Sequence, residues 1–195
     1  KLVCSGAASA DRASSGPPPT RAGTTRLYLS GPRAADIASL PVEGVELILV
    51  GETIGLASAV KMCTASVYKG RVALLAQALR TAAAFGVVEH VLDDLAGTGI
   101  ADRERTGATL GKASAKAWRY VAEMEEIAAT QGDAGLAPDL FRAVAHVYAD
   151  LAARGMADAP EDVPDDIALD EVLRRYAGAE LPAERRHTGF DDLGG

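Results

Sequence analysis

The chain has 195 residues, of which 48% are hydrophobic and 24% are charged, so its composition is that of a folded protein and not of a disordered one. Alanine is abundant and aromatic residues make up only 5%, which favours helices packed closely on helices over a β-sandwich. The formal net charge of -7 at pH 7 argues against a general nucleic-acid-binding surface, which needs to be basic.

Cysteine usage and hydropathy exclude further classes of protein. Cys4 and Cys63 lie far apart and form neither a C-x-x-C pair nor a cluster with histidine, so the sequence indicates no disulfide framework and no zinc site. No apolar run approaches the roughly 20 residues that a membrane helix needs, and no signal peptide is recognisable. We therefore expect a cytoplasmic protein that binds no metal and no membrane. Because the sequence begins with Lys1, we expect a fragment, a processed product or the ordered part of a longer protein.

The first quarter of the chain has loop and strand patterns. Residues 1–25 are rich in Gly, Ser and Pro and contain three consecutive prolines, so they predict an extended loop. Residues 26–52 predict a β-α-β unit, with strand-like runs "RLYLSG" and "VELILVGE" on either side of "PRAADIASL", which has a proline at a helix start. Such a unit cannot bury both faces of its strands alone, so we expect it to be the edge of a larger sheet or to lie against the following helices.

Residues 53–180 have a helical period. The segment from Ile54 to about Phe85 is long for a globular helix and predicts a central helix around which the others pack. Further helices are predicted at "VEHVLDDLAG", "SAKAWRYVAEMEEIAATQG", "APDLFRAVAHVYADLAARG" and "LDEVLRRYAG". Residues 181–195 predict a flexible tail. The expected fold is mainly α, a helical bundle around one long central helix, preceded by a short β-α-β unit.

One lysine in the long predicted helix is unusual. Apart from Lys69, Lys61 is the only charged residue in "GLASAVKMCTASVYKG", residues 55–70. Small and hydroxyl-bearing residues lie on its side of the helix, and they leave a hollow above it. A partly buried lysine can accept a proton near neutral pH or hold an anionic group. The alternative is a lysine that runs its methylene groups along apolar neighbours and keeps its ammonium group in water.

The stretch around Lys61 also carries a family resemblance. "GLASAVKM" resembles the segment that opens the helical domain of the β-hydroxyacid dehydrogenase superfamily, which includes 6-phosphogluconate dehydrogenase and 3-hydroxyisobutyrate dehydrogenase. "TTRLYLSGPRA", "KMCTASVYKG" and "AWRYVAEMEEIAATQGDAGLAPDLFRAVAHVY" resemble a branch whose C-terminal helical domain is a domain of unknown function. The resemblance covers roughly residues 14–155. It implies that Lys61 is the catalytic general acid or base.

The resemblance also implies a substrate site. "SSGPPP" stands where relatives have a Ser-Gly-Gly substrate-binding loop, which puts Ser15 and Gly16 beside the substrate. The glycine lets backbone N–H groups approach a carboxylate closely, and the serine offers a hydroxyl donor. Ser58 and Thr64 line the same site, one turn on either side of Lys61.

Two positions depart from the superfamily pattern. Ala65 stands where relatives commonly have an asparagine, and Tyr68 stands where 6-phosphogluconate dehydrogenase has a glutamate acid. The second proton carrier is therefore open, with Tyr68 as a candidate beside the substrate. The carboxylates of "AEMEEIA" share a helix face at Glu123 and Glu126, and we interpret them as a solvated face and not as acid/base groups.

The cofactor implied by the resemblance is NAD or NADP. Relatives bind it on an N-terminal βαβ domain, with a Gly-rich turn after the first strand. This sequence contains no G-x-G-x-x-G, and "GTGIADRERTG" follows a predicted helix, so we interpret it as a loop. Residues 26–52 then correspond to the terminal β-α-β of a Rossmann-type domain, and residues 1–25 to a loop or a fragment of that domain.

Two functional hypotheses follow. In the first, residues 53–180 are the substrate-binding and dimerisation domain of an NAD(P)-dependent oxidoreductase, which acts on a small hydroxy acid or a related substrate. The resemblance implies a homodimer in which the long helices of two subunits pack together. In the second, the chain is a stand-alone helical module that dimerises or binds a partner without catalysis. The missing Gly-rich turn favours the module, and the retained Lys61 favours the enzyme.

Overall fold

A computed structural model describes residues 9–16 and 25–177 of the chain. These residues form two compact units, and each is described by itself. The first unit contains the residues up to Lys69 together with Glu126–Asp139, and the second contains Gly70–Glu125 and the residues from Leu140 onward. The helices α2 (Leu56–Phe85) and α4 (Thr106–Asp133) contribute to both units. The predicted tail, 181–195, lies outside the described residues.

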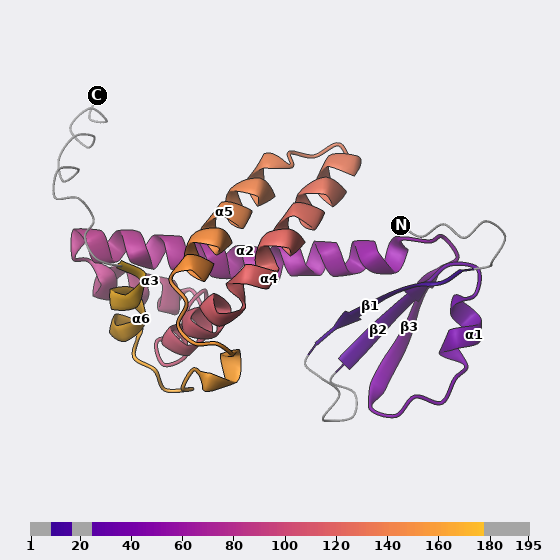
Figure 1. Ribbon diagram of the computed structural model, residues 1–195, viewed down its shortest axis with the longest axis horizontal. Coiled ribbons are helices and arrows are strands. Elements are labelled where there is room, and N and C mark those ends of the chain that lie inside the picture. Colours follow the sequence, from indigo (N-terminus) through magenta and orange to yellow (C-terminus); the bar gives the residue numbers. More distant parts are fainter. Residues whose placement is uncertain (1–8, 17–24, 178–195) are drawn as a thin grey trace. The chain divides into compact units, whose positions relative to one another are not determined.

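The first unit is built on a small sheet. Its strands, β1 (Asp11–Ser15), β2 (Thr25–Ser30) and β3 (Val45–Gly51), lie in the order β1-β2-β3. β2 and β3 are parallel and are connected through α1 (Ala34–Ala38), which packs against both of them (Figure 1). This arrangement confirms the β-α-β unit predicted over residues 26–52.

β1 corrects part of the loop prediction for residues 1–25. Its sequence, DRASS, has none of the β-branched or aromatic residues that signal a strand. It becomes a strand because it pairs antiparallel with β2, so that Ala13 lies opposite Tyr28 and is buried. The rest of the predicted loop, including the proline run, falls on 1–8 and 17–24, which the structure does not describe.

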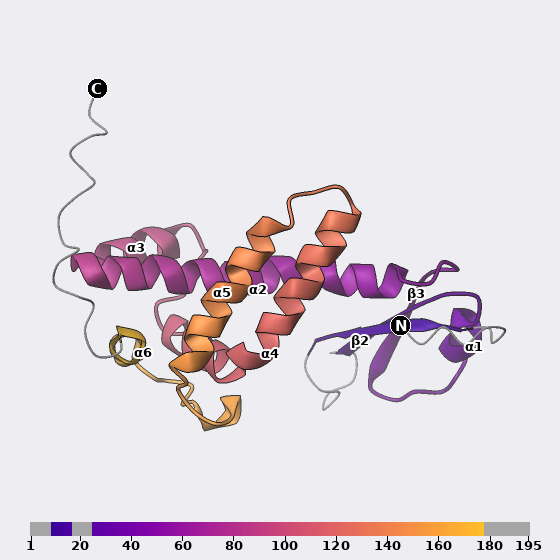
Figure 2. The same ribbon diagram turned by 45° about the horizontal axis from the view of Figure 1, so that its top comes forward.

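The second unit is helical. Besides its parts of α2 and α4 it contains α3 (Val88–Gly97), α5 (Asp139–Ala153) from Leu140 onward, the 3-10 helix η1 (Pro160–Asp162) and α6 (Leu169–Ala177). α4 and α5 lie side by side in both views (Figure 1 and Figure 2). Ser114 Oγ donates a hydrogen bond to the Leu151 carbonyl at 3.0 Å, and the Tyr120 and Tyr148 rings meet edge to face at 5.1 Å. These contacts join the two helices through buried residues and the half-buried Tyr120.

The long central helix is confirmed, while α4 is longer than predicted. α2 ends at Phe85, and Gly86 follows it with a φ of +71°, as expected of a helix stop. α4 begins at Thr106, within the segment interpreted as a loop. Its early residues Gly107 and Gly111 allow the chain at 163–169 to pack directly on the helix backbone, a contact between distant segments that local pattern does not reveal. The mainly α fold with a short β region is confirmed.

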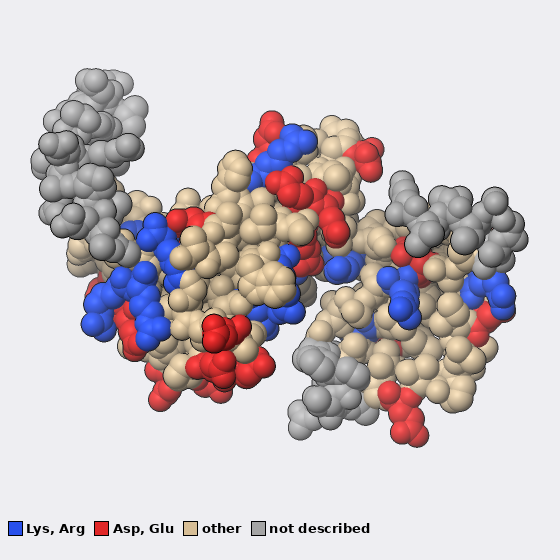
Figure 3. All heavy atoms as spheres, in the orientation of Figure 1, with Lys and Arg blue, Asp and Glu red and all other residues tan. Residues whose placement is uncertain are grey.

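The surface is acidic near η1. Figure 3 shows acidic side chains gathered over the segment that holds η1, where the exposed residues are Asp158, Glu161, Asp162, Asp165 and Asp166. Lys112 of α4 forms an ion pair with Asp165 of this segment. Among the described helices, none is both long and apolar enough to cross a membrane.

Candidate functional site

A carboxylate from β1 holds the start of α2. Ser58, in the first turn of α2, donates its backbone N–H to Asp11 Oδ2 at 3.0 Å and its hydroxyl to Asp11 Oδ1 at 2.9 Å. Ser30, at the end of β2, accepts the Ala57 N–H at 3.0 Å and donates to Asp11 Oδ2 at 3.4 Å. These bonds satisfy N–H groups that have no partner inside the helix. They join β1, β2 and α2 in one hydrogen-bonded frame.

Asp11 is charged at neutral pH in this frame. Burial raises the pKa of its carboxyl group, but hydrogen bonds from Ser58, Ser30 and the Gly55 backbone outweigh burial and leave the pKa below its ordinary value of 3.8. The negative charge lies at the N-terminal end of α2, where the helix dipole favours it.

Lys61 follows Ser58 by one turn of α2 and lines a pocket of about 460 Å³ in the first unit. The walls come from β1, from the start of α2 and from the last turns of α4. The lining residues are Arg12, Ala13, Ser14, Ser58, Lys61, Met62, Glu126, Ala129 and Thr130. Ala13 and Met62 are buried and make the apolar part of the wall. The pocket thus combines two cations, a carboxylate and three hydroxyl groups, a mixture that can hold a small polar acid.

The structure brings together some of the residues that the sequence singled out. Lys61 and Ser58 line the pocket, but Ser15, Gly16, Thr64 and Tyr68 are not among its lining residues. Gly16 is exposed after β1 with a φ of +107°. The Thr64 hydroxyl donates to backbone carbonyls of its own helix, and the Tyr68 side chain is 66% exposed.

The sequence pattern placed none of the other polar groups in the pocket, and Glu126 was interpreted as part of a solvated helix face. Arg12 and Ser14 lie on β1, which was not predicted as a strand, and Glu126 and Thr130 lie on α4. The spacing of four residues between Glu126 and Thr130 places both on one helix face. That spacing was the available signal, but it cannot tell a pocket wall from a solvated face.

A second hollow, in the second unit, has its charges paired internally. It has a volume of about 370 Å³ and is lined by residues of α2 and α6 and by Arg154, which follows α5; Arg80 and Tyr176 are among these residues. Asp150 accepts hydrogen bonds from Arg80 at 2.6 Å and from Arg154 at 3.0 Å. Burial raises the pKa of the Asp150 carboxyl group, but these two arginines outweigh burial and leave the pKa below its ordinary value. Since its charges satisfy one another, this hollow has the features of a structural ion-pair network.

The described residues do not fit a metal or a dinucleotide. Within 9–16 and 25–177, no group of three or more His, Cys, Asp or Glu side chains could hold a metal ion. No strand in these ranges is followed by the G-x-G-x-x-G turn that binds a pyrophosphate. What these residues offer chemically is proton transfer at Lys61 Nζ and anion binding by Lys61 and Arg12.

Comparison with known proteins relates the chain to dehydrogenase-like proteins. Residues 82–151 match a family described as a domain of unknown function, DUF1932. A conserved hypothetical protein from Sinorhizobium meliloti 1021 is 30% identical, with a TM-score of 0.70 over 86% of this chain. A conserved protein of unknown function, whose structure is described as similar to 3-hydroxyacid dehydrogenases, is 28% identical, with a TM-score of 0.62 over 74% of this chain. The chain spans 56% of the length of each of these two proteins. No curated protein matches significantly.

Proposed function

We propose that the chain is the substrate-binding and dimerisation part of an NAD(P)-dependent oxidoreductase, because residues 82–151 match DUF1932 and one similar solved structure is described as similar to 3-hydroxyacid dehydrogenases. The substrate is a small hydroxy acid or a related compound. One observation supports this proposal above the others: Lys61 lines a polar pocket together with Ser14 and Ser58. The alternative, a lysine that only keeps its ammonium group in water, does not account for such a pocket.

The proposed role of Lys61 is proton transfer. Its Nζ takes the proton of the substrate hydroxyl as the carbonyl forms, and returns that proton in the reverse direction. Arg12 and the Ser14 hydroxyl hold the substrate carboxylate, because an arginine donates charge-assisted hydrogen bonds in a planar fork. A nicotinamide supplies the hydride chemistry when bound. Since the described residues do not fit a dinucleotide, acid binding and proton transfer are the steps assigned to this chain.

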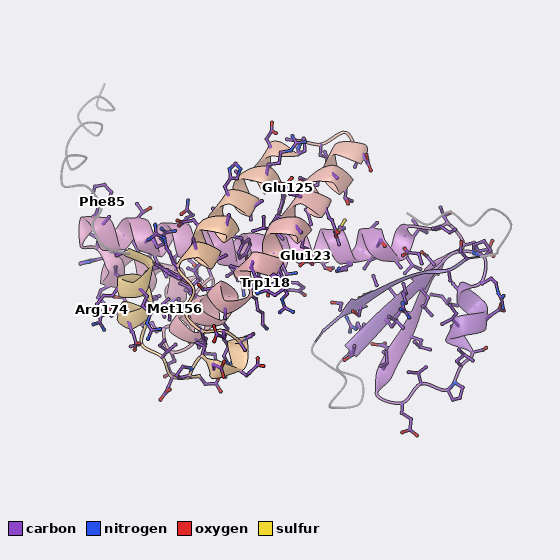
Figure 4. All side chains as sticks on the ribbon, viewed as in Figure 1. Phe85, Trp118, Glu123, Glu125, Met156 and Arg174 are labelled. Carbon is purple, nitrogen blue, oxygen red and sulfur yellow. The ribbon has the colours of Figure 1, made fainter. Side chains whose placement is uncertain are left out.

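An exposed stripe on α2 supports the proposed homodimer. In the second unit, Leu74, Ala78, Thr81 and Phe85 recur four, three and four residues apart and are all exposed. The side chains of Leu74 and Phe85 are 66% and 72% exposed, and Phe85 is labelled in Figure 4. Three of these four residues are apolar and Thr81 is small, and such residues at this spacing form a helix face that packs against another helix. We propose that the same face of a second copy covers it.

Calorimetric titration with 3-hydroxypropionate tests the proposed function. The chain is expected to bind this acid, and Lys61→Gln is expected to weaken binding by about tenfold or more, because a charge-assisted hydrogen bond to the carboxylate or hydroxyl is lost. Lys69→Gln is the matched control, since Lys69 lies on the same helix but outside the pocket lining.

The alternative is a helical module without catalysis. Failure of the unchanged chain to bind 3-hydroxypropionate would overturn the enzyme proposal and leave that module.

In a protein that also contains a cofactor domain, Lys61→Ala is expected to abolish turnover and to leave cofactor affinity unchanged. The cytoplasmic location expected from the sequence stays a prediction.

A further inference from the structure

Two opposite charges line the pocket of Lys61 without neutralising each other. Arg12 comes from β1 and Glu126 from α4. Across the described part of the chain, neither side chain makes an ion pair. By contrast, Arg26 on the neighbouring strand pairs with Glu46 at 3.1 Å. The charges of Arg12 and Glu126 are therefore available to a ligand.

Two hydroxyl groups of the pocket are set to accept hydrogen bonds. Ser58 Oγ donates its proton to Asp11 Oδ1 at 2.9 Å, and Thr130 Oγ1 donates its proton to the Glu126 backbone carbonyl at 2.9 Å. A hydroxyl has one proton and two lone pairs, so both oxygens can still accept. Together with the Glu126 carboxylate, these two oxygens form a set of hydrogen-bond acceptors. A ligand carboxylate cannot use them, because it has no proton to donate.

We propose that the substrate carries an ammonium group as well as its carboxylate and hydroxyl, which makes it a 2-amino-3-hydroxy acid. The carboxylate binds Arg12 and the Ser14 hydroxyl, the substrate hydroxyl lies at Lys61, and the ammonium group donates to the Glu126 carboxylate and to the Ser58 and Thr130 hydroxyl oxygens. This inference rests on the proposed function, because it takes the hydroxy-acid site as given. A hydroxy acid without the ammonium group leaves the Glu126 carboxylate facing a bound anion, and like charges repel.

L-serine and 3-hydroxypropionate form a matched pair of probes, because they differ only in the amino group. In calorimetric titrations of the whole chain, L-serine is expected to bind about threefold to fivefold more tightly than 3-hydroxypropionate. The difference is modest because the ion pair between the ammonium group and Glu126 is exposed. Glu126→Gln is expected to remove this preference while 3-hydroxypropionate binds as tightly as before or more tightly. Glu125→Gln is the control, since Glu125 is the neighbouring exposed carboxylate on α4 (Figure 4) and does not line the pocket.

Arg12 supplies the second arm of the test. Arg12→Gln is expected to weaken both ligands alike, by about fivefold, because both carry the carboxylate. Arg26→Gln, on the neighbouring strand, is expected to change neither affinity. Circular dichroism of each variant checks that it is folded.

The outcomes separate this inference from the proposed function. One outcome is that 3-hydroxypropionate binds at least as tightly as L-serine and Glu126→Gln alters neither affinity. That outcome would contradict the ammonium site and leave the proposed hydroxy-acid site unaffected. If neither ligand binds the folded chain, the proposed function is itself wrong.

Discussion

A single carboxylate, Asp11, decides how α2 begins. It accepts two hydrogen bonds from Ser58, and Ser58 precedes Lys61 by one helical turn. Asp11→Ala is expected to lower the free energy of unfolding at pH 7 by about 1 to 2 kcal/mol, as for other lost helix caps. Urea unfolding followed by circular dichroism measures it. Asp36→Ala is the control, because Asp36 pairs with Arg33 on the surface and its loss is expected to cost less than about 0.5 kcal/mol.

The pH dependence of this effect follows from the pKa of Asp11. That pKa is lower in the folded chain than the ordinary value of 3.8, so the unfolded state takes up protons first as the pH falls. The stabilisation is therefore complete above about pH 5 and is lost as the pH falls through the folded pKa. The difference in stability between the unchanged chain and Asp11→Ala is expected to narrow below about pH 4. A difference that stays constant down to pH 3 would contradict this assignment.

At the level of single residues, the sequence identified only part of the candidate site. Lys61 and Ser58 could be named because a resemblance pointed to one helix and the helical period grouped their side chains. Arg12 could not be named and Glu126 could not be assigned to the pocket, because both reach it only when β1 and α4 pack near α2. Ser15 was named from its place in a loop motif, whereas the structure puts its neighbour Ser14 in the pocket wall.

Among the elements, α4 depends on a glycine. A Cβ at Gly107 would overlap the Ile167 carbonyl oxygen and lie 3.0 Å from the Leu169 backbone nitrogen. Gly107→Ala is expected to lower the free energy of unfolding by about 1 to 3 kcal/mol, as overpacked positions do. Gly97→Ala is the control: a Cβ there meets nothing within 4 Å, and alanine favours helix over glycine by about 1 kcal/mol. Equal effects of the two substitutions in urea unfolding would contradict the close packing of α4.

Elements with a strong local period were predictable, and those set by distant contacts were not. The apolar and small residues of α2 predicted a helix ending at Phe85, where the structure ends it. β1 has no strand composition and exists through its pairing with β2. The start of α4 was missed for the same reason, since Gly107 is informative only once the segment at 163–169 is known to pack against it.

For the whole molecule, the central prediction is assembly through α2. Leu74→Glu puts a charge in the middle of the exposed stripe and is expected to convert the proposed dimer to a monomer, because an unpaired charge is costly in an apolar interface. Light scattering after size-exclusion chromatography measures the mass. Leu140→Glu, at an exposed leucine of α5, is expected to leave the dimer intact. A Leu74→Glu variant that stays dimeric would place the interface elsewhere.

An NMR titration of the 15N-labelled chain with 3-hydroxypropionate tests the proposed hydroxy-acid site most directly. The amide signals that shift are expected to belong to residues 11–15 of β1, to the first two turns of α2 around Lys61, and to residues 126–130 of α4. These shifts are expected to be strongly reduced in Lys61→Gln and unchanged in Lys69→Gln. Shifts centred on the second unit, or no shifts at all, would contradict the assignment of this pocket as a hydroxy-acid site.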